Sequence, residues 1–86
     1  MNTMSSTMND LRKRGYVEDF RLEKLGLQHT DSKLQIRPEE FVIDEVYGYE
    51  GMPNPEDEGV LYAITSAKYH LKGILRNTGQ WIWDIL

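Results

Sequence analysis

The residues of this chain that could do chemistry are mostly carboxylates, and they gather in the middle of the sequence. Between Arg37 and Lys68 there is no basic residue and there are eight acidic ones: Glu39, Glu40, Asp44, Glu45, Glu50, Glu56, Asp57 and Glu58. Carboxylates at this density repel phosphate backbones and attract cations or basic protein patches. The pattern predicts an acidic surface that binds a basic protein surface and disfavours nucleic acid as a partner.

The spacing of the other reactive residue types predicts neither a metal site nor a nucleophile. The run Glu56-Asp57-Glu58 lacks the alternating oxygen ligands of a calcium loop. His29 and His70 fall in or beside predicted turns, where we expect exposed or capping side chains, and no cysteine is present to complete a ligand set. We therefore expect no catalytic residue, no metal and no cofactor. An enzyme is the less favoured class.

Length and composition favour one small globular domain spanning residues 1–86. The chain has a net charge of −4 and 40% hydrophobic residues, which is typical of a soluble folded protein. No apolar run approaches the roughly 20 residues that cross a bilayer, so we expect no membrane partner. The absence of cysteine and of a hydrophobic N-terminal stretch favours a cytoplasmic location.

Hydrophobic spacing predicts a helix followed by strands. Met4, Met8 and Leu11 recur at helical spacing, with Thr3 as a possible cap and Gly15 placed to end the helix. Period-two patterns follow in residues 16–22, 33–37, 41–49, 60–66 and 71–76, with a polar turn expected over residues 28–32. The predicted fold is α+β, with an antiparallel sheet of about four strands. Four residues are expected in a short C-terminal helical turn: Trp81, Ile82, Ile85 and Leu86.

The strand over residues 41–49 has two readings. Its odd-numbered apolar residues Phe41, Ile43, Tyr47 and Tyr49 are expected on one face, with Val42 and Val46 on the other, or else a bulge interrupts the strand near Asp44 and Glu45. The residues expected in the core are Phe20, Leu34, Ile36, Phe41, Ile43, Leu61, Leu71 and either Met8 or Leu11.

Tyrosines beside carboxylates supply the candidate interaction surface. Tyr47, Tyr49 and Tyr62 are expected to pack as cross-strand neighbours, and an open face would make them a recognition surface. The candidate partner-binding residues are Tyr47, Tyr49, Glu50, Glu56, Asp57 and Glu58. We expect a small protein-interaction or regulatory module, with a small-ligand-binding protein or enzyme and a self-associating structural protein as alternatives.

Three segments resemble a set of short bacterial proteins that carry the label phosphoribosylpyrophosphate synthetase. They are residues 10–16, residues 37–51 and residues 60–64. The label implies two adjacent acidic residues at the end of a buried strand, followed by a Thr-Gly loop that holds phosphate. Asp44 and Glu45 match the first half of that pattern, but Thr78-Gly79 lies far along the chain. We therefore expect no synthetase activity.

Overall fold

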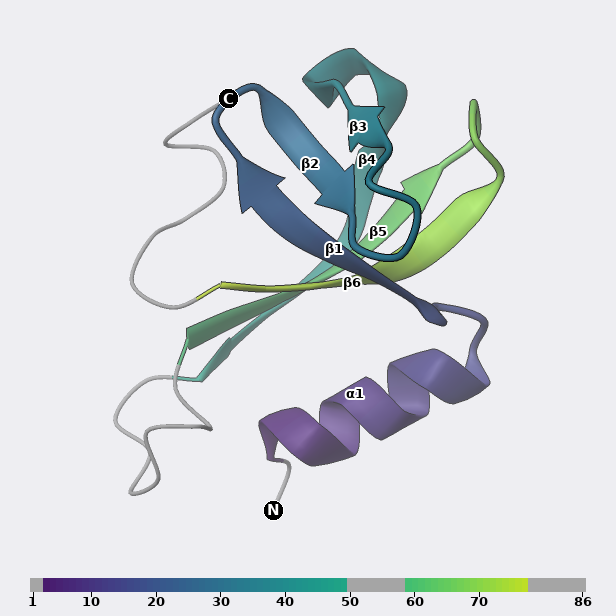
Figure 1. The fold of residues 1–86 in the computed structure, drawn as a ribbon. Helices are drawn as coiled ribbons and strands as arrows, with labels where there is room; N and C mark the ends of the chain where they lie inside the picture. The colour runs from purple at the N-terminus through teal and green to yellow at the C-terminus, as the bar shows by residue number, and fades with distance from the viewer. Residues whose placement is uncertain (1–2, 50–58, 78–86) are drawn as a thin grey trace.

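The computed structural model describes residues 3–49 and 59–77, which form one helix and a six-stranded sheet (Figure 1). The elements are α1 (Met4–Lys13), β1 (Glu18–Glu23), β2 (Gly26–His29), β3 (Gln35–Ile36), the 3-10 helix η1 (Pro38–Glu40), β4 (Val42–Tyr49), β5 (Gly59–Ser66) and β6 (Leu71–Asn77). The strand order is β3-β2-β1-β6-β5-β4. No helix among these residues is long and apolar enough to span a membrane.

The α+β class and the N-terminal helix are confirmed, but the predicted sheet is wrong in size and in strand direction. The sheet is mixed, because β1 and β6 run parallel while the other neighbouring pairs are antiparallel. The predicted C-terminal helical turn lies outside the described residues.

Helix α1 begins and ends where the sequence predicts. The Oγ1 atom of Thr3 accepts a hydrogen bond from the backbone N–H of Ser6 at 3.1 Å, which satisfies one free amide of the first turn. Gly15 follows the helix with φ of 103°, a conformation that side chains disfavour. Met4, Thr7 and Leu11 form the buried face of the helix against the sheet.

The parallel pairing of β1 with β6 depends on a glycine. Gly73 lies opposite Glu18, and a Cβ atom at this position would come within 2.4 Å of the backbone oxygen of Glu18. Only a residue without a side chain lets the two backbones approach this closely. The last described strand can therefore lie beside the first one.

The sheet buries side chains on both faces. The face under α1 holds Met4, Leu11, Tyr16, Tyr49, Leu61, Ala63 and Ile74. The opposite face holds Phe20, Leu27, Ile36, Phe41, Val60, Tyr62, Ile64 and Leu75. Of the predicted core residues, Leu34, Ile43, Leu71 and Met8 are only partly buried and pack around these two clusters.

A bulge in β4 moves its side chains from one cluster to the other. The pairing of β4 with β5 shifts register between Ile43 and Glu45. Ile43 packs with the Phe20 cluster, whereas Tyr47 and Tyr49 pack under α1. The bulge alternative is therefore confirmed, and the prediction of a single shared face is wrong because one extra residue inverts the alternation. Tyr62 lies on the opposite face, so the predicted packing with Tyr47 and Tyr49 is also wrong.

Strand β2 extends into the segment predicted as a turn. Gln28 and His29 pair with Arg21 and Phe20 of β1, and the turn follows at residues 30–32. His29 is only 7% exposed, so the expectation of an exposed or capping histidine is wrong. Antiparallel pairing with β1 outweighs the polar composition of this stretch.

Candidate functional site

Two of the six candidate partner-binding residues lie in the described part of the chain, and both are on the face covered by α1. Tyr49 is 9% exposed, and its hydroxyl is hydrogen-bonded to Oγ1 of Thr7. Tyr47 is half-buried, and its hydroxyl donates to the carboxylate of Glu45. Glu50, Glu56, Asp57 and Glu58 lie outside the described residues. Partner binding by these six residues stays a prediction.

Three of the four carboxylates of β4 and η1 have partners from distant parts of the sequence. Arg14 forms a two-pronged ion pair with Glu45, and Lys68 pairs with Glu40. Asp44 accepts hydrogen bonds from the Tyr16 hydroxyl at 2.8 Å and the Thr65 hydroxyl at 2.5 Å. These three carboxylates of the predicted acidic surface are therefore already paired within the chain, by cations and hydroxyls that lie outside the acidic stretch.

The titration of these groups reflects the same contacts. Hydrogen bonds from Arg14, and then from Tyr47, lower the pKa of Glu45 to about 2. The hydrogen bond from Lys68 lowers the pKa of Glu40. Burial, followed by the hydrogen bond to Asp44, raises the pKa of Tyr16. A carboxylate held in its charged form by a structural partner is a poor general base, so Glu45 is not a candidate for that role.

A groove of about 1050 Å³ opens on the opposite side of the sheet from α1. It lies between the β1–β2 hairpin tip, β3, η1, the start of β4 and the β5–β6 turn. Its lining includes Leu25, Leu27, Ile36, Phe41, Val42 and Tyr69, with Lys24, Arg37 and Glu39 among the charged residues. Lining of this mixed kind suits an amphipathic ligand or a protein segment.

Two exposed apolar side chains stand in this groove. Leu25 is 79% exposed and Val42 is 59% exposed, although both are large and hydrophobic. Leu25 is at the tip of the β1–β2 hairpin and Val42 is the first residue of β4. Exposed apolar side chains scattered singly need no explanation, whereas these two line the same hollow.

Both edges of the sheet meet this groove. In the described sheet β3 pairs only with β2, and β4 pairs only with β5. Gln35 and Ile36 of β3 and Val42 of β4 all line the hollow, which η1 bridges (Figure 1). An edge strand presents backbone N–H and C=O groups that a further strand can pair with.

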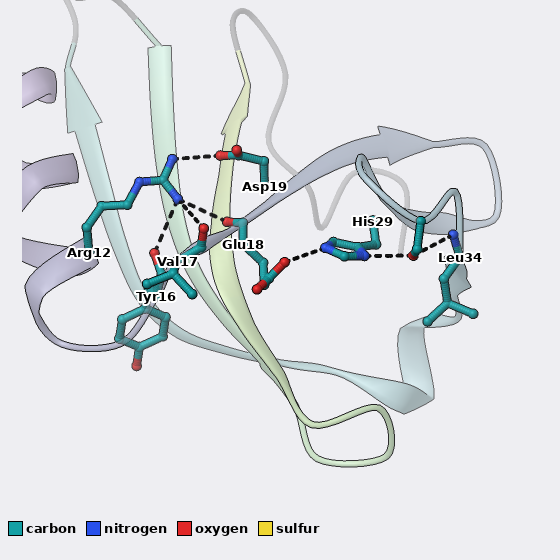
Figure 2. Close-up of polar contacts among 8 residues, drawn as sticks. Arg12, Tyr16, Val17, Glu18, Asp19, His29 and Leu34 are labelled. Carbon is teal, nitrogen blue, oxygen red and sulfur yellow. Dashed lines mark hydrogen bonds and ion pairs between the residues drawn. The ribbon is translucent and has the colours of Figure 1, made fainter.

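A polar chain lies at the other end of the β1–β2 hairpin (Figure 2). Nε2 of His29 is 2.6 Å from Oε1 of Glu18, and Nδ1 is 2.7 Å from Oγ of Ser32. Nearby, Arg12 donates to the backbone oxygen of Val17 at 2.8 Å and pairs with Asp19 at 2.7 Å, which anchors the start of β1 to α1. The sequence did not indicate this cluster.

The order carboxylate, imidazole, hydroxyl is that of a hydrolase triad, but the surroundings of Ser32 do not suit acyl transfer. Oγ of Ser32 already accepts the backbone N–H of Leu34 at 3.3 Å. The N–H of Lys33 donates to the backbone oxygen of His29 at 2.8 Å. The two amides that follow the hydroxyl are thus occupied and cannot stabilise an oxyanion.

Comparison with protein-family models, with curated proteins and with solved structures gave no match to this chain. The resemblance seen in residues 10–16, 37–51 and 60–64 therefore stays a prediction.

Proposed function

We propose that this protein is a small interaction or regulatory module that binds an extended segment of a partner protein in the groove between β3 and β4. The observation that carries the proposal is the pair of exposed apolar side chains, Leu25 and Val42, inside a hollow bounded by two sheet edges. An extended segment suits this geometry because its backbone can pair with an edge strand while an alternate side chain enters the hollow.

The partner segment is proposed to combine apolar and basic residues. Leu25, Val42 and Phe41 would contact its apolar side chains. The net charge of −4 favours approach of a basic segment over an acidic one. We place this activity in the cytoplasm, because the chain has no cysteine and so lacks the disulfides that are typical of small secreted domains.

Quantitative capture from a lysate of the native host tests the groove. The baits are the unaltered protein, Leu25→Asp, Val42→Asp and the control Val17→Asp, since Val17 is 57% exposed and lies outside the groove lining. A true partner is retained by the unaltered protein and by Val17→Asp, and it is lost from both groove variants. All four baits should melt at similar temperatures because the altered side chains are exposed.

Equal recovery of every captured protein by the four baits would contradict the proposal.

A small ligand is the second candidate for the groove, because the groove volume of about 1050 Å³ is close to the upper end of the roughly 300–1,000 Å³ typical of small-molecule sites. A small molecule that raises the melting temperature of the unaltered protein, but not that of the Val42→Asp variant, would favour this second candidate.

A further inference from the structure

Three side chains of metal-ligand type converge at the end of the β1–β2 hairpin that is remote from the groove. Glu18, His29 and Asp31 each offer one ligand atom, and these atoms all lie within 4.8 Å of one another. The strand register brings them together: Phe20 pairs with His29, so Glu18 precedes that pair on β1 and Asp31 follows it in the turn after β2. His29 and Asp31 follow Glu18 by 11 and 13 positions in the sequence, so a search for short motifs does not find the cluster.

The imidazole of His29 is held in place before any ion arrives. Its ring is buried and packs at a tilt against Phe20, with 6.0 Å between the ring centroids. Nδ1 is hydrogen-bonded to Oγ of Ser32 at 2.7 Å. Nε2 is hydrogen-bonded to Oε1 of Glu18 at 2.6 Å (Figure 2). In the hydrogen bond with Glu18 the hydrogen is on Nε2, because a carboxylate oxygen only accepts. When the hydrogen moves to Nδ1, the ring donates to Ser32 instead, and the freed Nε2 lone pair can bind an ion. Metal-bound histidines commonly have such a partner on the second nitrogen.

In the ion pairs found among the described residues, no arginine or lysine pairs with Glu18 or Asp31. The arginines and the lysine of those ion pairs bind other carboxylates: Arg12 binds Asp19, Arg14 binds Glu45 and Lys68 binds Glu40. The contact of Glu18 is with His29, and Asp31 lies exposed in the turn. The two carboxylates lie close enough to repel each other, and a divalent cation between them offsets that repulsion.

We propose that Glu18, His29 and Asp31 bind a divalent transition-metal ion of the zinc class. Nε2 of His29 and one carboxylate oxygen from each acidic residue would supply three ligands, and water would complete the coordination. Nitrogen and carboxylate ligands of this kind suit Zn²⁺, at about 2.0 to 2.2 Å from the ion. Ligand atoms around a tetrahedral ion are about 3.3 Å apart, so the exposed Asp31 side chain needs only a modest rotation to close the site.

Titration of the full chain with ZnCl2 by calorimetry, and with CoCl2 by visible absorption, tests the proposal. We expect saturable binding of one ion and a rise in melting temperature on adding Zn²⁺, because the ion binds the folded chain. The Asp31→Asn variant should weaken binding at least about tenfold, and Ser32→Ala by about 10- to 100-fold, since it releases the histidine ring. Asp31 is exposed, so Asp31→Asn separates loss of a ligand from loss of the fold.

The matched control is His70→Gln, which removes the other histidine of the chain. His70 lies exposed in the β5–β6 turn, and its removal should leave the affinity unchanged. The His29→Gln variant should abolish the cobalt absorption bands that arise from nitrogen coordination. Absence of saturable binding in the unaltered protein would overturn the proposal. Binding that survives Asp31→Asn unchanged and disappears in His70→Gln would overturn it equally.

Discussion

Thr7 and Tyr49 lie 42 positions apart in the sequence, yet their hydroxyl groups are hydrogen-bonded between α1 and the end of β4. Both residues are buried, with Thr7 8% and Tyr49 9% exposed. The contact links the helix to the sheet inside the cluster that also holds Met4 and Leu11. The tyrosine that the sequence pattern presented as a binding residue therefore has a structural partner.

This relationship predicts coupled losses of stability. Thr7→Val and Tyr49→Phe each remove one hydroxyl while keeping the shape of the side chain, and each should lower the free energy of unfolding by about 1 kcal/mol. The double variant should cost less than the sum, because the second substitution removes a group that the first left without its partner. Urea denaturation of the four proteins measures both quantities. Strictly additive losses would show that the hydroxyl contact contributes nothing.

Some of the fold could be predicted because it depends on neighbours in the sequence. The cap at Thr3, the glycine after α1, the short turn at Pro38 and the strands over residues 60–66 and 71–76 all follow from local patterns. These features are set by backbone preferences and alternation, which a short window of sequence contains.

The remaining features depend on contacts between distant segments. No local sequence pattern shows that β1 pairs in parallel with β6. The glycine that permits this pairing, Gly73, has no feature in the sequence that sets it apart from other strand residues. The sequence offers the bulge near Asp44 only as an alternative, because the alternation of apolar residues cannot show which face of the sheet the strand follows after a bulge. The ion pairs of Arg14 and Lys68 with the acidic stretch likewise need the folded chain.

The candidate sites were missed for the same reason. A hairpin register around Gly26 would have placed His29 opposite Phe20 and close to Glu18, but the polar residues after Leu27 favoured a turn there. The groove joins the two edges of the sheet, so its lining residues come from five separate parts of the chain. Among the groove residues, only Leu25 has a sequence feature that hints at exposure, because it is an apolar residue next to Gly26 of the hairpin.

A second prediction concerns the close approach of β1 and β6. Gly73→Ala should lower the free energy of unfolding by about 2 kcal/mol or more, because the new methyl group meets the backbone oxygen of Glu18 and the ring of Phe20. Gly48→Ala is the control, since Gly48 is exposed on the edge strand β4. Thermal and urea unfolding measure the difference. Equal stability of the two variants would show that the parallel pairing is absent.

A third prediction concerns acid stability. The folded pKa of Glu45 is lowered from 4.5 to about 2 by Arg14 and then Tyr47, so the unfolded chain takes up this proton first as the pH falls. The stabilisation is therefore complete above pH 4.5 and is lost as the pH decreases toward about 2. The difference in melting temperature between the unaltered protein and Arg14→Gln should shrink across this range.

Arg21→Gln is the matched control for the acid titration, because Arg21 is an exposed arginine on β1. Its melting temperature should follow that of the unaltered protein at every pH. Carbon-detected NMR of the Glu45 carboxyl group gives the pKa directly, and Arg14→Gln should move it back toward 4.5. A Glu45 pKa near 4.5 in the unaltered protein would contradict the ion pair.

The last prediction concerns the acidic run Glu56, Asp57 and Glu58, which we expect to steer a basic partner toward the protein. Replacing the three with Gln, Asn and Gln should leave the free energy of unfolding nearly unchanged, because a stretch of sequence rich in glycine and proline predicts solvated charged side chains, which contribute little to stability. The same variant should slow association with a groove-dependent partner and flatten its dependence on salt, while the dissociation rate stays similar. Surface plasmon resonance at low and high ionic strength measures both rates, with Asp10→Asn on the exposed side of α1 as the control.

An association rate that does not change with salt or with the triple substitution would contradict steering by this run. Micromolar calcium binding that disappears in the triple variant would instead assign the run to a cation.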